Sequence, residues 1–146
     1  ARLAQYDQQY AQKAEETFLK VITLSPKKQQ SYLGLIQLYI NTGHADRAFA
    51  LAKVVRDLDQ TYPDAHLFLA VSGIFSKNFD EAKTAVIAYK QLQNHPTGIE
   101  HIISAYARAG RYDEMALLYQ DLIKQYPQRA EYHARLAAVY AELGMK

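Results

Sequence analysis

The stretch IISAYARAGRYDEMALLYQDLIKQYP, from Ile102 to Pro127, is the most informative part of the chain for its fold class. After Ala109 and Gly110, apolar residues recur at helical spacing in Leu117, Leu118, Leu122 and Ile123, which indicates an amphipathic helix. A glycine at this place suits the left-handed residue that closes one helix before the next begins. The stretch therefore predicts two antiparallel helices joined at a glycine turn.

The same pattern returns at a constant interval. Alanine occurs at positions 14, 48 and 82, in two steps of 34 residues, and the register reaches Met115 after a further 33. Glycines 43, 110 and 144 keep this phase, as do tyrosines 39, 106 and 140, each set with steps of 67 and 34 residues. This period is typical of a helical solenoid. We expect Ala48 and Ala82 at close helix crossings, and we expect the three tyrosines to be packing residues whose hydroxyls find a partner.

Composition excludes several classes of protein. Hydrophobic residues make up 49% of the 146 positions and charged residues 22%, which favours a folded chain. The net charge of +2 argues against binding to nucleic acid or to an anionic membrane. The chain has no cysteine, and its longest apolar runs, 33–40 and 67–75, fall short of the roughly 20 residues of a membrane span. We expect a soluble segment of a longer array, either cytoplasmic or associated with the envelope, without direct membrane insertion.

Four prolines divide the chain. Proline is best tolerated in the first turn of a helix, so each predicts a helix start, with Ser25 as the N-cap at the first of them. Mid-repeat breaks are expected at 41–43, 77–78, 109–110 and 143–144. The resulting map is a single array of about nine helices and no strand. It consists of a partial repeat over 1–28, full repeats over 29–62, 63–95 and 96–129, and a lone first helix over 130–146, and the prolines are Pro26, Pro63, Pro96 and Pro127.

These residues resemble the tetratricopeptide repeat (TPR). The fourth repeat carries the resemblance best, in the run 102–115 and in Tyr119, Leu122 and Pro127. The second repeat matches with Leu35, Tyr39, Gly43, Ala45, Ala48 and Pro63, and the third with Leu69, Ala70, Phe79, Asp80, Glu81 and Ala82. The resemblance implies an all-α, right-handed superhelical solenoid of antiparallel helix pairs.

The third repeat departs from this pattern. Gly73 stands where a tyrosine is expected and Lys77 where a turn glycine is expected. Pro63 and Pro96 also come about one helical turn later in the register than the other two prolines. These changes argue against uniform curvature.

The resemblance also implies a concave groove lined by the first helices, which holds a peptide or helical segment of a protein partner. By register its lining is Gln37, Ile40, Asn41, Phe68, Val71, Ile74, Phe75, His101, Ser104, Arg108, Arg135 and Ala138. The expected partner has an apolar anchor near Phe68 and Phe75 and acidic groups toward the basic end. The alternatives are that Ile74 and Phe75 pack against a neighbouring helix and that the arginines are solvated. Some members of this family bind the C-terminal carboxylate of a partner with basic and asparagine side chains on the early repeats. The resemblance does not favour this mode here, because the matching positions carry Leu33 and Gln37.

We expect neither an enzyme nor a metal or cofactor site. The five histidines lack metal-ligand spacing. His66 and His133 share a register on first helices and are expected to pack between helices. The acidic pairs 80–81 and 113–114 stand at the starts of second helices, where negative charge favours the helix dipole.

Three further interpretations stay open. Residues 103–122 are also similar to a pentatricopeptide repeat, whose relatives read RNA, although the near-neutral charge argues against nucleic acid. Self-association through Leu136, Val139 and Tyr140 would cover an incomplete last repeat and give concentration-dependent homodimers. The runs 24–26 and 137–144 are similar to repeat modules of larger bacterial proteins, such as envelope-associated O-antigen ligase-like polymerases.

Overall fold

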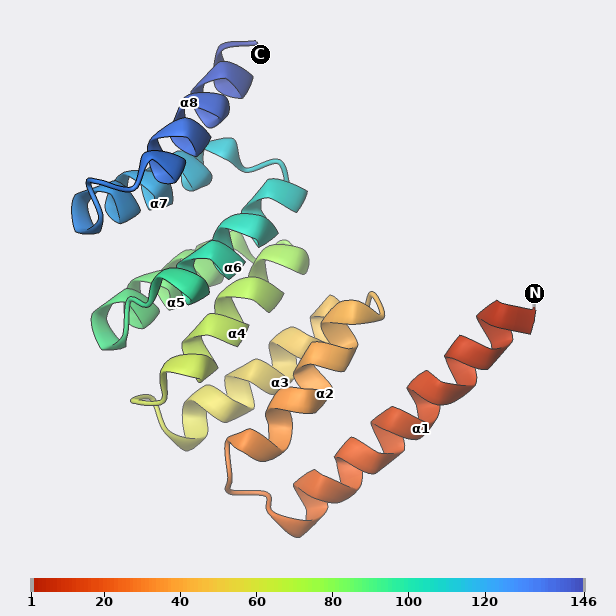
Figure 1. Cartoon of the computed structure of the whole chain (residues 1–146). Coiled ribbons are helices and arrows are strands. Elements are labelled where there is room, and N and C mark those ends of the chain that lie inside the picture. Colours follow the sequence, from red (N-terminus) through yellow and green to blue (C-terminus); the bar gives the residue numbers. More distant parts are fainter. Residues whose placement is uncertain (1, 146) are drawn as a thin grey trace. The chain divides into compact units, whose positions relative to one another are not determined.

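The computed structural model describes residues 2–145, and the side chains from residue 7 onward. Over this part of the chain the fold is all-α, with eight helices and no strand (Figure 1). The helices are α1 (Arg2–Leu24), α2 (Gln30–Asn41), α3 (Ala45–Leu58), α4 (Pro63–Phe75), α5 (Phe79–Leu92), α6 (Pro96–Arg108), α7 (Tyr112–Gln125) and α8 (Ala130–Gly144). The repeat map predicts about nine. The difference is α1, which runs unbroken because residues 2–24 contain neither glycine nor proline.

The helices form two compact units, which divide between Gln93 and Asn94. In the first unit α1 packs on α2, α2 on α3, α3 on α4 and α4 on α5, and α2 also contacts α4. In the second unit α6 packs on α7 and α7 packs on α8. Packing between sequence neighbours is typical of a repeat array. The pairs α2–α3, α4–α5 and α6–α7 fall within residues 29–62, 63–95 and 96–129.

The turns inside these pairs share one geometry. Gly43 and Gly110 adopt φ values of 80° and 71°, and Lys77 adopts 65° at the equivalent place. After each, a backbone N–H donates to the carbonyl five residues earlier, at 2.7 to 2.9 Å: His44 to Tyr39, Asn78 to Gly73 and Arg111 to Tyr106. These bonds satisfy carbonyls that the helix end would otherwise leave unpaired. The predicted breaks at 41–43, 77–78 and 109–110 are confirmed, and α8 ends at Gly144.

The prolines mark helix starts in only two of the four cases. Pro63 and Pro96 are the first residues of α4 and α6. Pro26 and Pro127 instead lie in turns, and the next helices begin at residues 30 and 130. Ser25 is not an N-cap, because its backbone N–H donates to the Val21 carbonyl at 3.0 Å and so belongs to the end of α1. The physical reason is register, since these two prolines stand about one helical turn earlier in their repeats.

Small residues permit close approach of α4 to its neighbours. Ala48 and Ala82 are completely buried, as predicted for close crossings. A Cβ atom on Gly73 would lie 3.1 Å from Ala82 Cβ and 3.2 Å from Cε1 of Phe49. Glycine in place of the expected tyrosine therefore lets α4 lie against both α3 and α5.

Two of the three periodic tyrosines are core residues. Tyr39 and Tyr106 are buried, whereas Tyr140 is 49% exposed, so the prediction of a packing role is wrong for Tyr140. Its hydroxyl does have a partner, because Gln120 Nε2 donates to it at 2.6 Å. In the described chain no second helix follows α8 to cover this position, as α3 and α7 follow α2 and α6. No helix within the described residues is long and apolar enough to cross a bilayer.

Candidate functional site

The predicted groove residues of the first unit lie on two adjacent first helices. Gln37 and Asn41 of α2 are exposed, and Gln37 Nε2 donates to Asn41 Oδ1 at 2.9 Å. Phe68, Val71 and Phe75 of α4 are half-buried, and their spacing of three and four residues places them on one helix face. Because α2 contacts α4, we treat these five residues together and call them the first-helix face.

Ile74 does not belong to that face. Its side chain is only 1% exposed and lies in the core, which agrees with the alternative that Ile74 packs against a neighbouring helix and does not line a groove. The physical reason is that α4 packs against α2, α3 and α5, which leaves it a narrow exposed strip. Ile40 is half-buried.

The remaining predicted residues belong to the second unit. His101, Ser104 and Arg108 are exposed on α6, at spacings of three and four residues. Arg135 on α8 is also exposed, and its Nη2 atom lies 2.6 Å from Glu131 Oε1. A hydrogen bond with Tyr119 raises the pKa of the Arg135 guanidinium. The ion pair with Glu131, on the same helix, therefore partly compensates the charge of Arg135.

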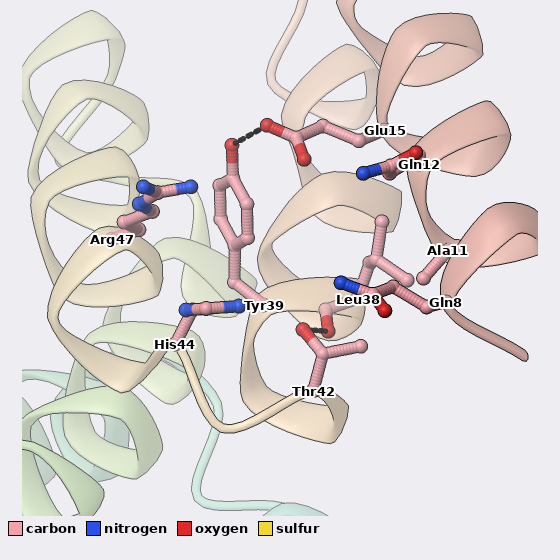
Figure 2. A pocket seen from close by; sticks show the side chains of 9 residues that line it. All are labelled: Gln8, Ala11, Gln12, Glu15, Leu38, Tyr39, Thr42, His44 and Arg47. Carbon is pink, nitrogen blue, oxygen red and sulfur yellow. Dashed lines mark hydrogen bonds between the residues drawn. The ribbon is translucent and has the colours of Figure 1, made fainter. Parts of the chain in front are cut away.

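A pocket of about 230 Å³ lies between α1, α2 and the start of α3 in the first unit. We call it the Tyr39 pocket, and Figure 2 shows its lining side chains. They are Gln8, Ala11, Gln12, Glu15, Leu38, Tyr39, Thr42, His44 and Arg47.

Tyr39 joins the three elements around this pocket. Its hydroxyl donates to Glu15 Oε1 of α1 at 3.0 Å. Arg47 of α3 lies over its ring, with Cζ 6.0 Å from the centroid, and the His44 ring stands edge-on with centroids 6.3 Å apart. Burial, and then the hydrogen bond to Glu15, raise the pKa of Tyr39, while Arg47 acts in the opposite direction. The tyrosine therefore stays a neutral donor that fixes Glu15.

A second pocket of about 440 Å³ lies between α3, α4 and α5. Its floor includes the buried His66, whose Nε2 lies 2.7 Å from the Gln60 carbonyl oxygen. A carbonyl only accepts, so Nε2 carries the proton. On the rim, Glu81 pairs with Lys53 at 3.2 Å. The residues that line it are Arg56, Asp57, Gln60, His66, Leu69, Glu81, Thr84, Ala85 and Ala88.

His66 belongs to a recurring local contact. Three first helices carry a side chain that bonds to the main-chain carbonyl six residues earlier: Tyr32 to Pro26, His66 to Gln60 and His133 to Pro127. Each contact fastens the turn that precedes the helix. His66 is buried, in agreement with the predicted packing role. His133 is exposed, so the packing prediction is wrong there.

Neither pocket was predicted from the sequence. The signal that could have found the Tyr39 pocket is the spacing of Gln8, Gln12 and Glu15, which places three polar side chains on one face of α1. Within the described residues, no three histidine, aspartate or glutamate side chains lie close enough together to hold a metal ion. The Tyr39 pocket offers hydrogen bonds, one guanidinium and one carboxylate, which is chemistry for binding.

Comparison with known proteins identifies the fold. No protein-family model and no curated protein matches the chain. Among solved structures, the chain is similar to a thermophilic TPR protein of Thermus thermophilus, with a TM-score of 0.69 and 18% identity. The match covers 94% of this chain and 76% of that protein, and it gives no support to an attachment to O-antigen ligase-like polymerases. Eight successive helices and this structural match together show that the chain has the tetratricopeptide-repeat fold.

Proposed function

We propose that the chain is a protein-interaction scaffold which binds a peptide or helical segment of a partner on the first-helix face. The role is binding without catalysis. The observation that carries the proposal is the row of half-buried apolar side chains at Phe68, Val71 and Phe75, beside the exposed amides of Gln37 and Asn41. The fold supports it, because stacked first helices present continuous surfaces.

The chemistry of the face defines the partner. Aromatic side chains that are already half-buried offer a large apolar contact at a small cost in conformational entropy. Carboxamide groups both donate and accept hydrogen bonds, so they can pair with the main chain of a bound segment. The expected partner therefore presents one or two large apolar side chains flanked by accessible backbone. In the second unit, His101, Ser104 and Arg108 would favour acidic partners, as a separate contact.

A peptide-display selection against the whole chain tests the proposal. Selected peptides should share an apolar anchor, and the double variant Phe68→Ala/Phe75→Ala should lower their affinity at least ten-fold. Ile87→Ala is the matched control, because Ile87 is a 53% exposed apolar residue of α5 in the same unit. It should change affinity less than two-fold.

Gln37→Ala provides a second variant that leaves the packing intact. Gln37 is exposed, so its loss should weaken binding several-fold without lowering stability. Peptides that bind the aromatic double variant as tightly as the unaltered chain would exclude this face as the binding surface.

A further inference from the structure

We propose that the Tyr39 pocket binds the side-chain carboxylate of an aspartate or glutamate within a peptide segment. This site is separate from the first-helix face, because none of its nine lining residues belongs to that face. Its volume of about 230 Å³ suits a single side chain with its adjoining backbone and not a folded element.

The two ends of the Tyr39 ring face different groups, and the negative charge of the pocket lies at one of them. Figure 2 shows Glu15 at the hydroxyl end of the ring and His44 and Thr42 toward its opposite end. The Tyr39 hydroxyl donates to Glu15 Oε1, which holds the negative charge at that end. A ligand carboxylate therefore has an approach away from Glu15.

The donors of the pocket suit an anionic oxygen. Arg47 presents a guanidinium with several N–H groups, and its Cζ atom lies 6.0 Å from the centroid of the Tyr39 ring. The planar edge of a guanidinium is the part that pairs with carboxylates in a bidentate manner. His44 is exposed at the turn and adds an imidazole toward the other end of the Tyr39 ring.

The α1 wall suits a peptide backbone. Gln8 and Gln12 stand one helical turn apart and line the pocket with their carboxamides. Each can donate to a carbonyl and accept from an N–H of the ligand. The hydroxyl of Thr42 donates to the Leu38 carbonyl at 2.8 Å, so it faces a ligand as an acceptor of main-chain N–H groups. An aspartate or glutamate within a peptide therefore offers a carboxylate for Arg47 and main-chain groups for Gln8, Gln12 and Thr42.

The site can be tested by nuclear magnetic resonance on the isotope-labelled 146-residue chain, with small probes. N-acetylglutamate N-methylamide should shift the side-chain signals of Gln8, Gln12 and the Arg47 Nε–H saturably. The neutral isostere N-acetylglutamine N-methylamide should bind at least five-fold more weakly. A carboxylate can also come from the C-terminus of a chain. N-acetylglycine, which carries a free main-chain carboxylate, represents that alternative and should also bind at least five-fold more weakly than the glutamate probe.

Variants separate recognition of charge from changes in folding. Arg47→Met keeps the length of the side chain and should weaken the glutamate probe at least five-fold, whereas Arg47→Lys keeps the charge and should stay within three-fold. Arg56→Met, on the same helix but outside the pocket, is the control and should stay within two-fold. The Phe68→Ala/Phe75→Ala variant should bind the probe unchanged, which keeps this test independent of the first-helix face.

Three results would overturn the proposal. The first is equal binding of the glutamate and glutamine probes, and the second is a loss in Arg47→Lys as large as in Arg47→Met. The third is binding of N-acetylglycine as tight as that of the blocked glutamate, which would assign the pocket to a chain terminus instead.

Discussion

Lys77 occupies a backbone conformation that the equivalent turns give to glycine. Its φ of 65° matches the values of Gly43 and Gly110, and the left-handed region costs a residue with a Cβ roughly 1–2 kcal/mol. Substitution by glycine would remove this cost, but glycine is also more flexible in the unfolded chain, which offsets part of the gain in stability. We expect Lys77→Gly to raise the free energy of unfolding by about 0.5–1 kcal/mol, measured by urea denaturation.

The reverse substitution is the control for this turn. Gly43→Lys should lower the free energy of unfolding by about 1 kcal/mol, because nothing but the backbone opposes it: a Cβ on Gly43 meets no atom within 4 Å. If Lys77→Gly destabilises the chain, the lysine side chain contributes more than its backbone strain costs.

Tyr106 should make stability fall at alkaline pH. Burial, followed by the charge of Glu114, raises the pKa of its hydroxyl to about 12, from an ordinary value of 10.0. Above pH 10 the unfolded chain loses this proton while the folded chain keeps it, so stability declines as pH rises toward 12. Tyr106→Phe should remove about 1 kcal/mol of that decline at about pH 11, measured from urea midpoints at about pH 9 and pH 11.

The control for the alkaline effect is Tyr140→Phe. Tyr140 is half exposed, so this variant removes a tyrosine hydroxyl without removing a buried one. An equal effect of both variants would show that general charge repulsion, and not burial of Tyr106, causes the decline.

At the scale of the helix, the crossing of α4 with α3 and α5 limits side-chain size. A Cβ on Gly73 would already lie 3.1 Å from Ala82 Cβ, so a larger side chain must push the helices apart. Gly73→Val should lower the free energy of unfolding by about 1–3 kcal/mol, measured by urea or thermal denaturation. Gly144→Val is the matched control, because a Cβ there meets no atom within 4 Å, and it should change stability by less than about 0.5 kcal/mol.

Helix ends were easier to predict than helix starts. The three turns at residues 43, 77 and 110 follow from a local requirement, a left-handed residue that closes a helix, and two of them carry glycine. Helix starts after proline do not follow from one residue. A proline can stand at the first helical position, as Pro63 does, or in the preceding turn, as Pro26 does.

At the scale of the whole chain, the two units should differ in their ability to fold alone. The first contains five helices and the second three, and a chain of about 50–60 residues is only marginally stable because it buries a smaller share of its surface. We expect the fragment 1–93 to keep a cooperative unfolding transition and the fragment 94–146 to unfold at a lower urea concentration. Circular dichroism of both fragments measures this. Loss of helical structure in the fragment 1–93 would show that it needs the second unit.

Self-association stays a prediction with a smaller surface than expected. Val139, one of its three proposed contacts, is only 5% exposed and is thus unavailable to a second copy. Tyr140 and Leu117 remain exposed in the same unit. Sedimentation at increasing concentration should show dimers that Tyr140→Glu weakens, and a monomer at every concentration would exclude this role.

The candidate sites show where sequence reasoning reaches its limit. The register implied by the family resemblance placed Phe68 and Phe75 in a groove, and it placed Ile74 there as well. Burial of neighbouring residues such as Ile74 and Phe75 depends on which helices pack beside them, and the register does not contain that information. For the Tyr39 pocket, the spacing of Gln8, Gln12 and Glu15 places three polar side chains on one helix face, but it does not indicate which other helix they meet. The hydrogen bond of this pocket joins Tyr39 to Glu15, 24 residues away on another helix.

The 34-residue period, the paired helices and the turns within the pairs could be predicted from the amino-acid sequence, because helix periodicity and left-handed turn residues act over a few neighbouring positions. Three features emerge only in the folded chain: which apolar side chains are core and which are surface, where the helices after Pro26 and Pro127 begin, and that Glu15, Tyr39 and Arg47 share a pocket. These features depend on contacts between residues far apart in the chain, and a local sequence pattern does not predict the energies of such contacts.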